Sequence, residues 1–316
     1  MSVIISGSLA FDTVFEHHGR FADTLHADAI EHLNLTFQAD AMRRTLGGCA
    51  GNIAYSLKVL GGDPLIWTAA GQDAAPFFEH FKAHDITTDG IVTLADHWTA
   101  QCVITTDTLG NQLTTFHPGA MAKADKIPWP HQADITLGIL APSCRNTLLA
   151  HAQAYQAHGI PFIFDPGQIT PLFTADELIH LSESAMAVAF SDYEATLIEK
   201  TTGLNTAQLS HHAKLIFCTH GSEGSSLWEN GHETLVPSTP VKAVDPVGAG
   251  DAYRGGLLFG FTHGLSPYQC AQLGTLMGAA KVSVDGHNYQ IDRRMIDKTL
   301  LQFRTEAKSP HRNRSK

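Results

Sequence analysis

The sequence predicts an α/β fold, in which a mostly parallel central sheet carries helices on both faces and a small β-structure is attached. Short apolar runs alternate along the chain with segments of helical periodicity, a pattern typical of parallel sheets. Two segments interrupt this alternation, and one of them contains a hairpin pattern. The chain has 316 residues, of which 43% are hydrophobic, so it can bury a full core in one large domain or two ordinary ones.

The alternating elements follow one another in a regular order. Apolar runs predict strands at 3–9, 65–69, 135–140, 161–164, 185–190 and 215–219. Apolar residues at helical spacing predict helices near 50–60, 77–81, 147–158, 176–181, 193–199 and 249–261. Because most of these strands are joined through a helix, we expect them to pair in parallel.

The two interrupting segments predict a β-lid. Residues 11–46 hold no convincing strand–helix unit, and 98–107 and 112–117 alternate around the turn at 109–111. We expect a lid over the carboxyl ends of the parallel strands, where such folds bind ligands; an edge hairpin without a lid role is the alternative. The predicted boundaries are 1–12, 47–96 and 119–305 for the α/β domain, 13–46 and 97–118 for the β-lid, and 306–316 for a flexible basic tail.

Composition narrows the class of protein. The formal net charge is −10, and an acidic surface repels phosphate backbones, which disfavours nucleic acid as a partner. The sequence contains no stretch of about 18 apolar residues, so no membrane span is predicted. Residues 1–7 (MSVIISG) are typical of a strand rather than a signal peptide. The five cysteines include no C-x-x-C pair, so we expect reduced thiols and a cytoplasmic protein.

The segment 243–260 (AVDPVGAGDAYRGGLLFG) predicts an anion-binding helix start. Gly248, Ala249 and Gly250 stand before a run with helical apolar spacing, and the first N–H groups of a helix have no internal partner. Those groups and the helix dipole favour a phosphate at this position. Asp251, in the first turn, can accept a proton from an attacking hydroxyl. Taken alone, the motif fits an ordinary acidic helix start equally well.

Other phosphate-binding motifs are missing. The sequence contains no G-x-x-x-x-G-K-[ST], which argues against a P-loop. Tyr253 stands where the third glycine of G-x-G-x-x-G belongs, and the motif does not follow the first strand. A nicotinamide-dependent oxidoreductase is therefore disfavoured.

A second constellation points to a ligand with hydroxyl groups. In 46–54 (LGGCAGNIA), two glycines precede a helix, and Asn52 stands in its first turns although asparagine is a modest helix former. Its amide is suited to a ligand hydroxyl, or to a local hydrogen bond near the cap. Asp12 follows the first strand and could hold two neighbouring sugar hydroxyls or simply form a turn.

These residues resemble the PfkB, or ribokinase-like, family of carbohydrate and nucleoside kinases. The family's GGxxxN pattern is matched at 47–52, and its D-x-x-G-A-G-D pattern at 245–251, in the same order along the chain. The resemblance implies a ribokinase-like three-layer α/β/α sandwich with a small β-lid. It also implies phosphoryl transfer from ATP, with Mg²⁺ and, in some members, K⁺.

The resemblance implies a role for each matching residue. Asp251 would be the catalytic base, and Gly248, Ala249 and Gly250 the anion hole. Substrate would be bound by Ser8, Asp12, Thr36, Gly48, Asn52, Phe116 and Gln168. ATP would be bound by Ser191, Glu194, Thr219 and Gly221, with Glu194 tied to Mg²⁺. The family's N-x-x-E motif has Ser191 in place of its asparagine, K⁺ would lie near Asp245 and Val247, and the adenine pocket would lie around 284–289.

Within the family the chain looks most similar to bacterial adenosine kinases, in segments such as 6–12 (SGSLAFD) and 115–121 (TFHPGAM). Phe116 would stack on a purine base, which aromatic rings do well, or belong to the core of the lid. Cys102 stands where a second aromatic residue would be expected, so a simple sugar such as ribose remains an alternative substrate. A non-catalytic nucleoside-binding regulator is a further alternative, and homo-oligomerisation is left open.

Overall fold

The computed structural model describes residues 1–24, 35–131, 134–284, 286 and 293–308. Within these residues the larger sheet has the strand order β13-β12-β11-β10-β9-β8-β1-β4-β5. All neighbours from β11 to β5 pair in parallel, whereas β11-β12 and β12-β13 are antiparallel. The strands are β1 Ser2–Ser6, β4 Asp63–Gly71, β5 Ile91–Leu94, β8 Ile135–Leu140, β9 Phe162–Phe164, β10 Ala187–Ser191, β11 Ile216–Thr219, β12 Gly224–Glu229 and β13 His232–Pro237.

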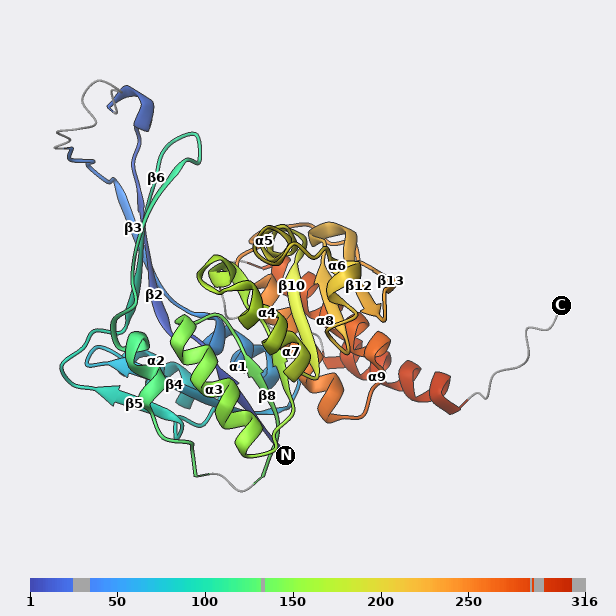
Figure 1. Cartoon of the computed structure of the whole chain (residues 1–316). Helices are drawn as coiled ribbons and strands as arrows, with labels where there is room; N and C mark the ends of the chain where they lie inside the picture. Colours follow the sequence, from blue (N-terminus) through green and yellow to red (C-terminus); the bar gives the residue numbers. More distant parts are fainter. Residues whose placement is uncertain (25–34, 132–133, 285, 287–292, 309–316) are drawn as a thin grey trace.

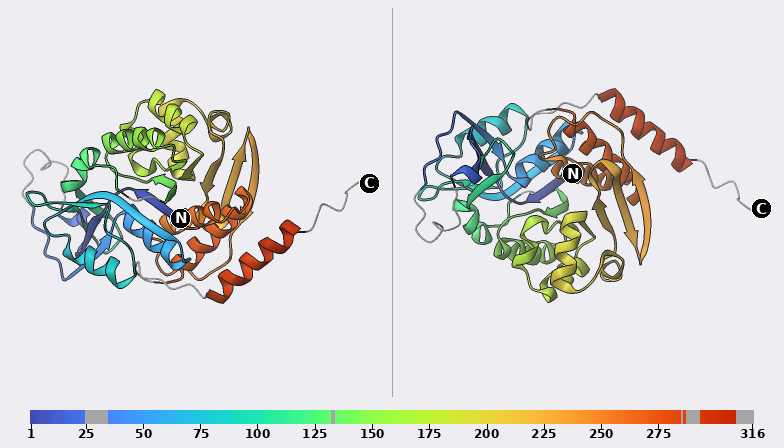
Figure 2. Two further views of the ribbon diagram at one scale, coloured as in Figure 1. Left: turned by 90° about the horizontal axis from the view of Figure 1, so that it is seen from below. Right: turned by 90° about the horizontal axis from the view of Figure 1, so that it is seen from above.

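Helices cover both faces of this sheet (Figure 2). One layer contains α1, α7 and α8, in which α7 contacts both of the others, and the other layer contains α3, α4 and α5. Strand β1 shows why two layers are needed, because Val3 and Ile5 pack into one core cluster and Ile4 into the other. The helices are α1 Cys49–Val59, α2 Ala75–Ala83, α3 Arg145–Ala157, α4 Ala175–Ser184, α5 Asp192–Thr202, α6 Thr206–Leu209, α7 Ala249–Thr262, α8 Pro267–Val282 and α9 Arg293–Lys308.

A second, four-stranded sheet stands away from the main body (Figure 1). It has the order β3-β2-β6-β7 and is built from β2 Ala10–Glu16, β3 Ala41–Gly47, β6 Ala100–Thr106 and β7 Gln112–His117. We call it the lid sheet. The hairpin that alternation predicts at 98–117 is present, since β6 and β7 pair antiparallel from Gln101–His117 to Thr106–Gln112. Strand β2 joins the two halves, with β3 on one side and β6 on the other.

Two parts of the fold differ from the expectation. Strands β12 and β13 form an antiparallel hairpin whose turn, Asn230-Gly231, has φ of 50° and 82°. The Asn-Gly pair is a strong hairpin signal, so these strands were recognisable in the sequence and were missed. The tail predicted for 306–316 begins too early, because α9 continues to Lys308; residues 309–316 lie outside the described part. Among the described helices, none combines the length and the hydropathy that a membrane crossing requires.

Candidate active site

Asp251 and Asn52 meet at the point where two helices begin. Asp251 lies in the first turn of α7, which starts after Gly248 in the left-handed conformation (φ 80°). Asn52 lies in the first turn of α1, and its Nδ2 donates to Asp251 Oδ2 at 2.8 Å. Burial and then the charge of Asp251 raise the pKa of the Cys49 thiol. Burial likewise raises the pKa of Asp251 to about 6, and the Asn52 hydrogen bond opposes the rise.

The anion hole predicted at the start of α7 has the expected backbone. The left-handed Gly248 and the following Ala249 and Gly250 bring the helix N-terminus next to Asp251. The Ala249 N–H donates to Pro246 O at 3.2 Å, so in this conformation that group already has a partner. Binding of a phosphate by these residues stays a prediction.

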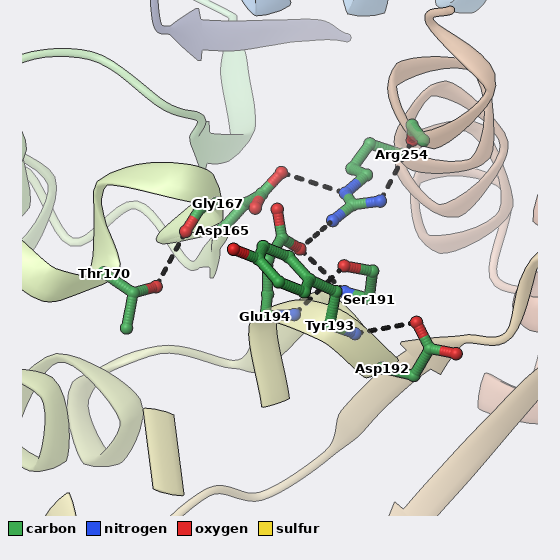
Figure 3. Close-up of polar contacts among 9 residues, drawn as sticks. Asp165, Gly167, Thr170, Ser191, Asp192, Tyr193, Glu194 and Arg254 are labelled. Atoms are coloured by element: carbon green, nitrogen blue, oxygen red, sulfur yellow. Dashed lines mark hydrogen bonds and ion pairs between the residues drawn. The ribbon is translucent and has the colours of Figure 1, made fainter. Parts of the chain in front are cut away.

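The buried Arg254 joins three segments of the chain (Figure 3). Arg254 Nε donates to Asp165 Oδ2 at 2.9 Å, its Nη2 lies 3.8 Å from Glu194 Oε2, and its Nη1 donates to Gly250 O at 3.2 Å. Burial raises the pKa of Asp165 to about 7 although Arg254 opposes the rise. Arg254 therefore ties the start of α7 to the segments that follow β9 and β10.

Ser191 and Glu194 are held together by the start of α5. The Ser191 N–H donates to Glu194 Oε2 at 2.7 Å, and the Glu194 N–H donates to Ser191 Oγ at 3.3 Å. This reciprocal pair is a capping box, and serine caps a helix as well as asparagine does. The substitution of Ser191 into the family's N-x-x-E motif thus preserves the local structure that positions Glu194.

One row of side chains runs across the lid sheet from Asp12. Thr45, Asp12, Cys102 and Phe116 are directly opposite one another on β3, β2, β6 and β7, so they share one face. A Cβ on Gly47 would come within 2.1 Å of Asp12 Oδ2, so this glycine makes room for the carboxylate. Burial and then the charge of Asp251 raise the pKa of Asp12 to about 6, which places both carboxylates in one site.

Phe116 is not part of a lid core, because 49% of it is exposed. The alternative interpretation of Phe116 as a core residue is therefore wrong. It lies two strands from Asp12, which corresponds to about 10 Å. That spacing leaves an exposed aromatic ring at a distance from the carboxylate suited to a base attached to a sugar.

Ser8 and Gly48 have evident structural roles. Ser8 Oγ accepts a hydrogen bond of 3.1 Å from the Cys49 N–H at the start of α1. Gly48 has φ 94°, and a Cβ there would lie 2.5 Å from Ser8 O. Both residues pack the start of α1 against the β1–β2 connection, and direct contact with a substrate stays a prediction for each.

The start of α7 also forms part of the wall of a large cavity. Its volume is about 800 Å³, in the range of ligand pockets, and predicted ATP-binding residues Thr219 and Gly221 line it together with Ala249 and Gly250. Of the described residues, Thr275, Ala279 and Val282 on α8 also line it, but Val284 and Gly286 do not. Most of the predicted adenine segment, 284–289, lies outside the described residues.

Of the predicted substrate residues, Thr36 lies away from this site, and a substrate contact of Gln168 stays a prediction. Thr36 is exposed and precedes β3 at the end where Ala41 pairs with Glu16. The seven residues of β3 span about 20 Å, and Thr36 precedes the end of the strand that is far from Gly47. Gln168 is exposed just after Gly167 in a 3-10 turn. Phe37, next to Thr36, packs against His17 and Phe21.

Sequence reasoning missed three residues of the site. Cys49 was treated only as a reduced core thiol, and Asp165 and Arg254 were given no role. Arg254 carried a recognisable signal, because it interrupts the apolar run of α7 and yet is only 5% exposed. Asp165 directly follows β9, at the ligand-binding edge of the parallel sheet.

Comparisons with known proteins match the chain to one family model and to solved structures of the same fold. The family model described as pfkB family carbohydrate kinase matches residues 22–293. The structure is similar to that of a Burkholderia thailandensis nucleoside kinase in complex with inosine, which is 36% identical, with a TM-score of 0.83 and coverage of 96% of this chain and 97% of that chain. The same protein in complex with ADP-inosine gives a TM-score of 0.80, with 99% of each chain covered.

Curated relatives include both nucleoside and sugar kinases. A nucleoside kinase of Methanocaldococcus jannaschii is 24% identical over 256 residues, which cover 80% of this chain and 84% of that protein. A fructokinase of Klebsiella pneumoniae is 28% identical over 241 residues, which cover 69% of this chain and 78% of that protein. The relatives thus share a reaction type and differ in the acceptor that carries the hydroxyl.

Proposed function

Because this chain belongs to the pfkB family of carbohydrate kinases, we propose that it transfers the γ-phosphoryl group of ATP to the primary hydroxyl of a purine nucleoside. The chain is a phosphotransferase with the ribokinase-like fold, a three-layer sandwich with a small β-lid. The observation that carries the proposal is the Asn52–Asp251 hydrogen bond at the start of α7. It holds the Asp251 carboxylate next in the chain to Gly250, which lines the cavity with Thr219 and Gly221, and close enough to Asp12 for the two charges to interact.

In the proposed reaction, Asp251 accepts the proton of the substrate's hydroxyl as its oxygen attacks the γ-phosphorus. The bond from that phosphorus to the bridging oxygen breaks, and ADP leaves with the electron pair. The N–H groups at the start of α7 would stabilise charge on the phosphoryl oxygens. Asp12 would hold hydroxyls of the sugar. The base would then lie over the same face of the lid sheet, in the direction of Phe116.

Magnesium would enter with the nucleotide. Mg²⁺ is usually held by one or two carboxylates together with phosphate oxygens and water, and it would neutralise phosphate charge here. Glu194 fits such a site, because its capping hydrogen bond already fixes the carboxylate at the edge of the sheet. Arg254 Nη2 lies 3.8 Å from Glu194 Oε2, so this carboxylate would share its charge between the guanidinium group and an ion.

The preference for a purine nucleoside rests on Phe116 and on a relative. An exposed aromatic ring about two strands from the sugar-binding carboxylate suits a flat base, and stacking on it needs no particular base edge. The similar Burkholderia thailandensis protein was solved in complex with inosine. Adenosine, expected from the sequence, and inosine are therefore the first two substrates to compare.

The test is ADP release with ATP and Mg²⁺ against adenosine, inosine, guanosine, cytidine, ribose and fructose 6-phosphate. We expect turnover with the purine nucleosides and little with the sugars. Turnover with ribose or fructose 6-phosphate alone would retain the kinase reaction and overturn the nucleoside assignment. An Asp251→Asn variant measured in parallel separates turnover at this site from a contaminating kinase.

A further inference from the structure

A buried lysine occupies the segment where some members of the family would hold K⁺. Lys281 lies in the last turn of α8 and is 1% exposed. Its ammonium group donates to Asp245 Oδ2 at 2.9 Å and to Asp245 O at 3.1 Å. A carboxylate and a backbone carbonyl are hard oxygen ligands of the kind that a monovalent cation takes.

Asp245 is the centre around which this segment is organised. Its Oδ1 accepts from the Val247 N–H at 3.0 Å, and its Oδ2 accepts from the Gly286 N–H at 3.2 Å. Burial opposes ionisation of Asp245, but the hydrogen bond from Lys281 and those backbone N–H groups outweigh it, so its pKa lies below the usual value. The Asp245 carboxylate is thus ionised, and its negative charge is balanced by the Lys281 ammonium group of the same chain.

The same segment leads directly into the α7 N-terminus. The N–H groups of Val244 and Asp245 both donate to Val282 O, one residue after Lys281, at 2.8 and 3.1 Å. Three residues beyond Asp245 the chain reaches Gly248, after which α7 begins. The Lys281 ammonium group, which binds Asp245, therefore helps to hold the backbone that leads into the predicted anion hole.

A potassium ion does not fit beside this ammonium group. An ion bound to Asp245 Oδ2 and Asp245 O would have to share both oxygens with a charge already within 3.1 Å of each. Two like charges at contact distance on one carboxylate repel strongly in a half-buried site, where solvent screens them poorly. The K⁺ site expected at Asp245 and Val247 is thus incompatible with the position of Lys281.

We propose that the Lys281 ammonium group is a built-in monovalent cation, which orders the segment before the anion hole and makes the kinase independent of K⁺. The charge is covalently attached to α8, so it is present at every salt concentration. Lys281 is a positioning residue in this proposal, since it acts on the phosphate site through Asp245 and the backbone at 245–248.

The first test uses the unmodified protein in KCl, NaCl and choline chloride at equal ionic strength. We expect turnover in the three salts to agree within about twofold. Lys281 supplies the cation in each salt, and equal ionic strength screens surface charges equally. The unfolding temperature should also be the same in KCl and choline chloride. Activation by K⁺ of about tenfold, or an unfolding temperature raised by K⁺ alone, would overturn the proposal. The unfolding measurement needs no substrate, so it holds even if the proposed nucleoside acceptor is wrong.

The second test is Lys281→Met, which keeps an unbranched side chain of nearly the same length and removes the charge. We expect this variant to lose about tenfold or more in turnover in choline chloride, because the half-buried Asp245 carboxylate is left without a positive charge beside it. KCl or NH₄Cl should restore most of that loss and raise the unfolding temperature of the variant. Lys200→Met, at an exposed position of α5, is the matched control and should respond to no cation. A folded Lys281→Met protein that no cation rescues would count against the proposal, as would one that needs no rescue.

Discussion

The side-chain amide of Asn52 donates a 2.8 Å hydrogen bond to the carboxylate of Asp251, although 199 residues separate them in the chain. This contact changes the interpretation of Asn52. The sequence motif suggests an amide aimed at a substrate hydroxyl, whereas the structure gives that amide to the proposed base. A hydrogen bond to the charged form of a carboxylate favours ionisation. Asn52 therefore orients Asp251 and opposes the pKa rise that burial causes.

Replacing Asp251 by asparagine should abolish most turnover and leave the fold intact. The variant keeps the size of the side chain and removes its ability to accept a proton. We expect turnover to fall by about 10²–10⁴-fold, the usual contribution of a general base, with little change in substrate affinity. Steady-state kinetics and substrate binding by calorimetry measure the two effects separately. Turnover within a few-fold of the original would exclude Asp251 as the base.

Turnover should depend on pH through the same carboxylate. Asp251 is active only when ionised and has a pKa of about 6, so kcat should rise with pH through 6 and level off above it. Asp12, also with a pKa of about 6, titrates in the same range, but its role is in binding. Asp12→Asn should therefore raise KM and retain the fall in kcat below pH 6. A kcat that is flat between pH 5 and 8 in both proteins would contradict the assignment.

Removing the Asn52 amide should move that profile to higher pH. Asn52→Ala deletes a hydrogen bond that stabilises the ionised form of Asp251, so its pKa rises further above 6. We expect the lower limb of the kcat profile to shift by about one pH unit, equivalent to roughly 1.4 kcal/mol. The variant should therefore retain a larger fraction of the original protein's turnover at pH 8.5 than at pH 6. A raised KM with an unshifted profile would restore the interpretation of Asn52 as a substrate ligand.

Arg254 should contribute far more to stability than an exposed arginine does. Its guanidinium and the Asp165 carboxylate are 6% and 3% exposed, so Arg254→Met leaves a buried carboxylate without its partner. Loss of one partner of a buried pair typically costs about 3–5 kcal/mol of unfolding free energy. Arg145→Met is the control, because Arg145 pairs with Glu177 at a position that is 34% exposed and should cost about 1 kcal/mol or less. Equal denaturant midpoints for the two variants would show that the Arg254 network is not needed for stability.

The parts of the molecule that the sequence could predict are those encoded over a few residues. Helical spacing after Gly248 predicts α7, and alternation around Gly110 predicts the lid hairpin, because each depends on neighbouring residues. The contacts of Asn52 and Lys281 could not be predicted in this way. Each joins segments that only the packing of α1, α7 and α8 brings together. Spacing within one motif identifies a functional residue, but not the partner that the rest of the chain supplies.

Charged residues inside apolar helices are the exception, and they were visible in advance. Lys281 follows the run 276–280 (LMGAA), and Arg254 precedes 255–259 (GGLLF). A lysine or arginine at such a position is rarely buried without a paired carboxylate. The pattern predicts that a partner exists and leaves its identity to the structure, which supplies Asp245 and Asp165.

Phe116 should distinguish nucleosides from sugars. It is 49% exposed on β7 and lies in the same cross-strand row as Asp12, so Phe116→Ala removes a stacking surface without opening a core cavity. Stacking of a base on an aromatic ring is worth about 1–3 kcal/mol, so KM for adenosine or inosine should rise by roughly 5–150-fold. The KM for ribose, which has no base, should stay the same, and so should the unfolding temperature. Leu109→Ala, which is 65% exposed at the tip of the same hairpin, is the control for a general effect on the lid sheet. Equal changes in KM for nucleoside and ribose would mean that Phe116 affects closure of the site and not recognition of a base.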